Sequence, residues 1–250
     1  MMVDALMVLG ENRFGPTLEV DDALRIADEL ELDRVVAAPA RPLDYHLEPA
    51  NERLAEAARQ SGGRLAALGR VDPLNGDKAL AEASRCLGEQ GCAGLFLHPG
   101  EEAFPATRAG HVLEVAQEHR APVIIATGYF SLSEPLQVAQ LAAEFPEIPV
   151  VMTTGGQINI SGLSMVDAWL ALTSNANLHV MTNGEYRQDF IEQLVSDFDF
   201  ERVLYASFAP VFDPTFERKR IRSARMTLEA RRAVEGGNAA RLFRLGGGKE

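Results

Sequence analysis

The sequence has few cysteines and fewer basic than acidic residues. Cys86 and Cys92 are the only cysteines among 250 residues, which excludes a disulfide framework and suits a reducing compartment. Lysine and arginine number 24 against 36 acidic residues, so the formal net charge is −12. A field of that sign repels phosphate backbones and anionic lipids, so neither a nucleic acid nor a membrane is an expected partner.

Long apolar runs and several common motifs are also missing. The apolar runs stop after about seven residues, far short of the ~20 that a membrane-spanning helix requires. The first residues lack the basic region of a secretion signal, and we expect a cytoplasmic protein. No Gly-x-Gly-x-x-Gly follows the first apolar run, and no Walker or Gly-x-Ser-x-Gly sequence occurs. These absences argue against a dinucleotide-binding domain, a P-loop and a nucleophile elbow.

Short apolar runs recur along the chain, and segments of helical period separate them. Each run holds five to seven residues with little charge, which is typical of parallel strands buried on both faces. Eight strand–helix units at this length predict one α/β domain, a (β/α)8 TIM-type barrel over residues 1–245 with a tail at 246–250. The expected strands are Val3–Leu9, Arg34–Ala38, Leu65–Val71, Gly94–His98, Val123–Thr127, Val150–Thr154, Leu178–Thr182 and Arg202–Ser207.

Polar side chains follow the expected strands, where the chemistry of such barrels collects. His98 ends the fourth strand and His46 follows the second, so both are candidate catalytic residues. Other polar residues at strand ends would line a pocket mouth able to hold a small carboxylated or cyclic ligand. These candidate binding residues are Arg70, Thr127, Tyr129, Thr153, Asn183 and Ser207.

Several segments resemble the amidohydrolase-related family of metal-dependent hydrolases and decarboxylases. Arg64–Pro73 resembles the third strand of that family, Gly94–Pro99 the fourth and Arg202–Pro210 the eighth. Gly237–Phe243 resembles the family's closing helix, and the likeness as a whole runs from Val3 to Leu245. The resemblance implies a distorted (β/α)8 barrel that holds a divalent metal ion through histidine and aspartate side chains.

The positions at which the resemblance implies metal ligands carry other residues. Leu6 and Val8 occupy the two histidine positions of the first strand, and Ala126 occupies the ligand position of the fifth. Thr153 replaces a histidine on the sixth strand, and Phe208 replaces the aspartate of the eighth. Four of these side chains offer no donor atom, and a threonine hydroxyl is a weak ligand. We therefore expect no metal and no other cofactor.

These replacements leave it open whether the chain is an enzyme. The favoured hypothesis is a pseudoenzyme with a degenerate metal site, a non-catalytic binding or regulatory subunit in a homo-oligomer or in a hetero-oligomer with a metal-bearing homologue. An alternative is a metal-independent hydrolase or lyase, with His98 or His46 as general base and Arg70 as the anchor of a small carboxylated or cyclic substrate. A third hypothesis retains a metal on Glu11, His46 and His98.

Overall fold

All eight expected strands are present in the computed structural model, which describes residues 1–157, 163–185 and 187–246. Six of the eight end one to three residues before the expected position, because their last residues already turn into loops. Residues 247–250 of the predicted tail lie outside the described residues. The strands are β1 (Val3–Leu9), β2 (Arg34–Pro39), β3 (Leu65–Ala67) with β4 (Gly69–Arg70), β5 (Leu95–Leu97), β6 (Val123–Ile125), β7 (Val150–Met152), β8 (Leu178–Met181) and β9 (Val203–Leu204).

Neighbouring strands pair in sequence order and in parallel, which confirms the predicted barrel fold. β1 to β3 form one paired set and β4 to β9 a second, and Leu68 alone separates β3 from β4. Backbone hydrogen bonds also join the first strand to the last. The amide of Ala5 donates to the carbonyl of Tyr205 at 3.0 Å, and the amide of Val8 donates to the carbonyl of Ala209 at 2.8 Å.

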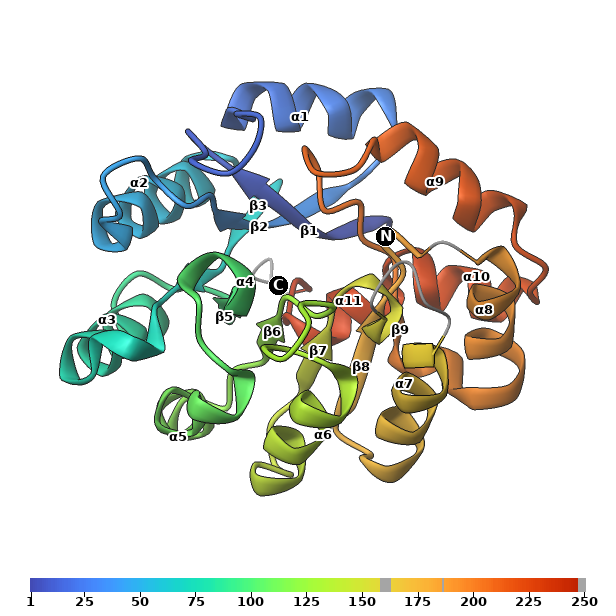
Figure 1. Cartoon of the computed structure of the whole chain (residues 1–250). Coiled ribbons are helices and arrows are strands. Elements are labelled where there is room, and N and C mark those ends of the chain that lie inside the picture. Colours follow the sequence, from blue (N-terminus) through green and yellow to red (C-terminus); the bar gives the residue numbers. More distant parts are fainter. Residues whose placement is uncertain (158–162, 186, 247–250) are drawn as a thin grey trace.

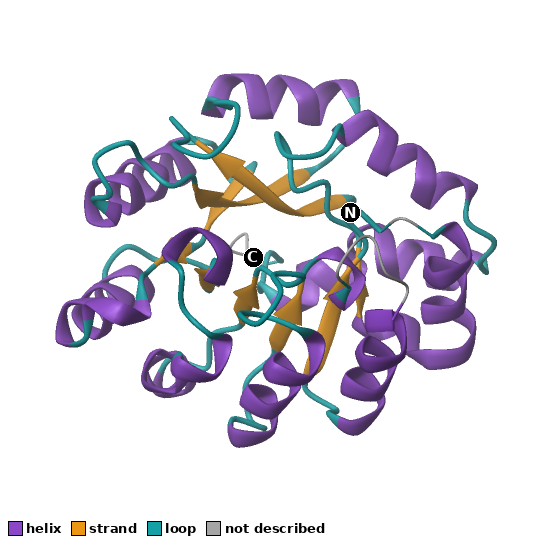
Figure 2. Ribbon diagram, in the orientation of Figure 1, coloured by secondary structure: helices purple, strands orange, loops and turns teal. Residues whose placement is uncertain are grey.

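Helices cover the outside of the strands (Figures 1 and 2). α1 shows why these segments become surface helices: Ala23 and Ala27 are buried in the core, whereas Arg25 forms exposed ion pairs with Asp22 and Glu29. The helices are α1 (Val20–Glu29), α2 (Leu47–Gln60), α3 (Asp77–Gly88), α4 (Pro99–Glu102), α5 (Gly110–Glu118), α6 (Pro135–Glu144), α7 (Leu163–Ser174), α8 (Gln188–Gln193), α9 (Pro214–Ser223), α10 (Leu228–Arg232) and α11 (Asn238–Leu242).

Alternate side chains of the strands enter two separate apolar cores. On β1, Met7 and Leu9 pack in the layer between strands and helices, whereas Leu6 and Val8 lie in a second cluster. That second cluster collects side chains from all eight strands and fills the barrel interior. The interior of this barrel is therefore a packed core, and a ligand can reach only its two ends.

Two expectations drawn from composition can be compared with the structure. None of the described helices is both long enough and apolar enough to span a bilayer. Cys86 lies within α3 and Cys92 just before β5, and both thiols are free and buried. Their burial and lack of a disulfide agree with the predicted placement of the two cysteines.

Candidate functional site

The carboxyl ends of the strands form one end of the barrel, the mouth, where most of the predicted site residues lie. The loops after the strands bring them there, because parallel strands end at a common edge. They are Arg70 at the end of β4, His98 after β5, Thr127 and Tyr129 after β6, Thr153 after β7, Asn183 after β8 and Ser207 beyond β9. His46 lies directly before α2, in the loop that follows β2.

His98 is the N-cap of α4 and is 3% exposed. Its Nδ1 accepts a hydrogen bond from the amide of Glu101 at 3.1 Å, and its Nε2 lies 3.3 Å from the hydroxyl of Tyr129. Burial, followed by the charge of Arg70, lowers the pKa of His98 well below 6.5, so the ring is neutral near pH 7. Since Nδ1 accepts, the neutral tautomer carries its proton on Nε2. No ring nitrogen of His98 is then free to take a proton from a substrate.

Arg70 is fully buried, and its guanidinium is already bonded within the chain. Its Nη2 lies 2.7 Å from Glu102 Oε1 and 2.5 Å from Glu101 Oε2, and its Nη1 donates to the carbonyl of Pro39 at 3.1 Å. Arg41 binds the same Glu102 oxygen at 3.2 Å. The predicted anchor of a carboxylate thus holds two carboxylates of its own chain.

Sequence reasoning missed Arg41, Glu101 and Glu102 as partners of Arg70. The available signal was local: Pro99 after His98, followed by two acidic residues, is the pattern of a helix start. That pattern predicts a short helix. It does not indicate which cation the carboxylates would meet.

The predicted polar lining of the mouth is largely bonded to itself. Thr153 and Asn183 are fully buried and Thr127 is 4% exposed. The Oγ1 of Thr153 accepts from the amide of Thr127 at 2.9 Å, and the Oδ1 of Asn183 accepts from the amide of Thr154 at 3.3 Å. These side chains connect neighbouring strand ends, and their role in ligand binding stays a prediction.

Ser207 bonds to Asp4 inside the barrel. Its amide donates to Oδ1 of Asp4 at 2.9 Å, and its hydroxyl accepts from the amide of Ala209 at 3.1 Å. Burial raises the pKa of Asp4 to about 6, while the bonds to Ser207 act in the opposite direction. Asp4 therefore ties the first strand to the loop after the last strand, as a hydrogen-bonding residue of the barrel.

Apolar side chains close the barrel axis below the mouth. Leu6, Val8 and Ala126 belong to the interior core, and Phe208 is 5% exposed. The ring of Phe208 contacts those of Phe96, His98 and Phe212 at centroid distances of 6.3, 6.4 and 6.3 Å. Four of the five positions that the resemblance assigns to metal ligands are thus filled by packed hydrocarbon.

His46 is separate from this cluster and lies beside the mouth. It is exposed and lines a hollow of about 270 Å³ together with Arg41, Tyr45, Arg70 and Lys78. His46 and Arg70, both predicted site residues, therefore share this hollow.

The set Glu11, His46 and His98, on which a metal could survive, is not supported by the structure. Glu11 lies in a different hollow, with Gly10 and Arg53. Among the residues that the structure describes, no three His, Cys, Asp or Glu side chains gather in a way that could hold a metal ion.

Glu185 is a buried acid near the mouth that was not among the predicted site residues. It is 2% exposed, its Oε1 accepts from the amide of Arg187 at 3.0 Å, and its Oε2 has no hydrogen-bond partner within the described residues. Burial raises the pKa of Glu185 to about 7, although Arg220 and Arg187 act in the opposite direction. Its position two residues after Asn183 offers no signal of burial.

We expect Glu185→Gln to change how stability depends on pH. The carboxyl binds its proton more tightly in the folded chain, so its favourable contribution is complete below pH 4.5 and is lost as pH rises through about 7. Between pH 5 and pH 8 the free energy of unfolding should fall by about 2 kcal/mol more in the wild type than in the variant. Urea unfolding of both proteins at the two pH values measures this difference. An equal change in both would contradict the proposed burial of the charge.

Comparison with solved structures shows the same fold in decarboxylases. The 2,6-dihydroxybenzoate decarboxylase from Rhizobium has a TM-score of 0.78 at 14% identity and covers 98% of this chain and 99% of its own. The dihydroxybenzoic acid decarboxylase from Polaromonas sp. JS666, with bound manganese, has a TM-score of 0.78 at 14% identity, over 99% and 98% of the two chains. The 5-carboxyvanillate decarboxylase from Novosphingobium aromaticivorans, complexed with manganese, has a TM-score of 0.71 at 15% identity, over 89% and 79%.

These structures correct the cofactor expectation. We expected neither a metal nor another cofactor, and proteins of the same fold are solved with bound manganese, which contradicts that expectation. The residues at the implied positions are nevertheless a poor match for such an ion. Leu6, Val8, Ala126 and Phe208 offer no donor, and the hydroxyl of Thr153 already accepts a backbone amide. We therefore derive no chemical step through a metal.

The family of the chain follows from its sequence. The curated proteins contain no significant match to the sequence. The model of one protein family does match, and it extends over residues 9–245, nearly the whole chain. The chain belongs to the amidohydrolase family.

Proposed function

We propose that this chain is a non-catalytic member of the amidohydrolase family that acts as a binding or regulatory subunit. It would work in an oligomer, with copies of itself or with a metal-bearing homologue. The observation that carries the proposal is the closed barrel mouth, where Phe208 packs on Phe96 and His98 above an apolar interior. A decarboxylase needs space and charge at that place for its substrate.

The electrostatics of the mouth support the same proposal. Arg70 is fully buried at the mouth, and the carboxylates of Glu101 and Glu102 form ion pairs with it. A substrate carboxylate would have to displace one of them from a buried ion pair, which is costly. His98 has no free acceptor nitrogen, and burial raises the pKa of Tyr129 to about 12, so its hydroxyl stays protonated near neutral pH. His98 and Arg70, the predicted general base and the predicted anchor, are thus both bonded within the chain.

The hollow beside the mouth is where the subunit would hold a small carboxylated or cyclic ligand. Arg41 and Lys78 line it together with the exposed His46, and Glu48, Asp72 and Glu82 are also in its lining. The charged groups of arginine and lysine bind carboxylates through charge-assisted hydrogen bonds. An alternative function, a hydrolase or lyase with a remodelled site, would use His46 as general base in this hollow rather than His98.

An activity assay with manganese present tests the proposal. We expect no release of carbon dioxide from 2,6-dihydroxybenzoate or 5-carboxyvanillate above the uncatalysed rate when Mn²⁺ is supplied. A decarboxylase of the same fold, assayed in parallel, controls for the substrates and the metal. Manganese-dependent turnover, together with about one bound manganese per chain, would overturn the proposal. Turnover that His46→Ala abolishes would instead establish the alternative.

The mass of the native protein provides a second, independent readout. We expect native mass spectrometry of the purified chain to show an oligomer, or a stoichiometric complex once a metal-bearing homologue is added. A monomer under both conditions would contradict the role as a subunit.

A further inference from the structure

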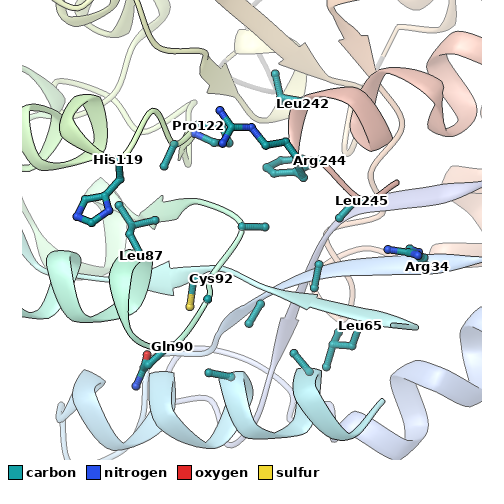
Figure 3. A pocket seen from close by; sticks show the side chains of 18 of the residues that line it. Arg34, Leu65, Leu87, Gln90, Cys92, His119, Pro122, Leu242, Arg244 and Leu245 are labelled. Atoms are coloured by element: carbon teal, nitrogen blue, oxygen red, sulfur yellow. The ribbon is translucent and has the colours of Figure 1, made fainter. Parts of the chain in front are cut away.

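A second hollow, of about 430 Å³, lies at the end of the barrel opposite the mouth (Figure 3). Several of its lining residues begin strands or directly precede them. Arg34 is the first residue of β2, Leu65 is the first of β3, and Pro122 directly precedes β6. The amino ends of parallel strands meet at one end of a barrel, so this hollow is distinct from the site at the mouth.

The charge of this hollow differs from that of the whole chain. Arg34, Arg59, Arg120 and Arg244 line it together with His119, and no acidic residue occurs among its described lining residues. Figure 3 shows Arg34, Arg244 and His119 on different sides of the hollow. In a chain of net charge −12, such a gathering of cations without carboxylates creates a local positive field.

Two of the arginines have no side-chain partner among the described residues that would compete with a ligand. Within the described residues, the guanidinium groups of Arg34 and Arg120 form no hydrogen bond and no ion pair. The guanidinium of Arg244 donates from Nη2 to the carbonyl of Arg120 at 3.1 Å and keeps its other donors. Arg59 is paired with Glu56. Most of the donors around the hollow are therefore available.

The remaining lining residues are mainly apolar. Small and aliphatic side chains from α2 and α3, from the starts of the strands and from the residues around α11 provide this surface. They are Ala55, Ala58, Leu65, Ala67, Leu87, Ala93, Ala121, Leu242 and Leu245. A surface of this kind favours a ligand that has a hydrocarbon part beside its charge.

We propose that this hollow binds a small organic dianion, a phosphate monoester or a dicarboxylate carried on a short apolar body. Guanidinium groups bind phosphate and carboxylate through paired N–H donors, and two unpaired arginines match two negative charges. The volume lies within the range of small-molecule sites, and the apolar lining accommodates the body of the ligand. The barrel thus has a ligand site at the end that its family chemistry does not use.

Titration calorimetry with phenyl phosphate tests the proposal on the full chain. At low ionic strength we expect a dissociation constant below about 1 mM, which weakens as salt is added. Inorganic phosphate and phenol should each bind at least roughly tenfold more weakly than phenyl phosphate. Inorganic phosphate lacks the apolar body, and phenol lacks the doubly charged group. Equal binding of inorganic phosphate would overturn the organic part of the proposal, and no binding of phenyl phosphate would overturn the site.

Single charge-removing variants place the binding in this hollow. Arg34→Gln and Arg120→Gln should each raise the dissociation constant for phenyl phosphate roughly fivefold to tenfold. Arg225→Gln is the matched control, since Arg225 is 88% exposed, pairs with Glu192 and does not line the hollow. It should change the constant less than about twofold. Equal effects of all three variants would show a general charge effect and overturn the assignment.

Discussion

Replacing Glu102 by alanine should lower the free energy of unfolding by about 3–5 kcal/mol, the largest effect that we expect from one substitution. Glu102 is fully buried at its side chain and holds Arg70 at 2.7 Å and Arg41 at 3.2 Å. Its removal leaves Arg41 without its carboxylate and Arg70 with Glu101 alone. Buried cations without partners lose hydration and gain little in return. Urea unfolding of the wild type and of Glu102→Ala at pH 7 measures this difference in the free energy of unfolding.

A variant at an exposed glutamate controls for the loss of charge alone, so that the effect of burial can be separated from it. Glu29 pairs with Arg25 at 3.0 Å, but these side chains are 61% and 60% exposed. Glu29→Ala should therefore change the unfolding free energy by less than about 0.5 kcal/mol. If Glu102→Ala does not fold, Glu102→Gln provides a second test, because its amide keeps an oxygen for the arginines. We expect this variant to remain folded, with a free energy of unfolding between those of the wild type and the alanine variant. Equal effects at positions 102 and 29 would contradict the buried network.

Replacing Phe208 by alanine should cost about 3 kcal/mol and open the barrel mouth. Phe208 contacts three rings and closes the apolar axis of the barrel, so its removal leaves a cavity between Phe96 and His98. Phe208→Asp should destabilise at least as much, because a carboxylate would lie unpaired against these rings. Urea unfolding of each variant measures the loss.

Phe130 provides the control for Phe208. It is 79% exposed, and Phe130→Ala should alter stability by less than about 0.5 kcal/mol. A loss at position 208 no larger than that at position 130 would show that Phe208 does not close the mouth by packing.

The positions of the strands could be predicted well from the sequence. Each strand is buried on both sides, so it must be a short run without charge, as in Val123–Ile125 and Val150–Met152. The alternation of two cores on β1 follows from the same geometry. The strand ends were placed less accurately, because the residues that leave the strands, such as Thr127 and Thr153, are also buried and carry no charge.

The sequence by itself determined the barrel fold and the family, because strand patterns and side-chain identities can be read residue by residue. Only the tertiary structure decided how the polar groups combine. Arg70 meets Glu102 across 32 residues, and Arg41 meets it across 61. The hollow at the opposite end joins side chains as far apart as Arg34 and Arg244. Contacts of that sequence separation depend on how the strands are arranged side by side, which leaves no periodic signal at the positions that it brings together.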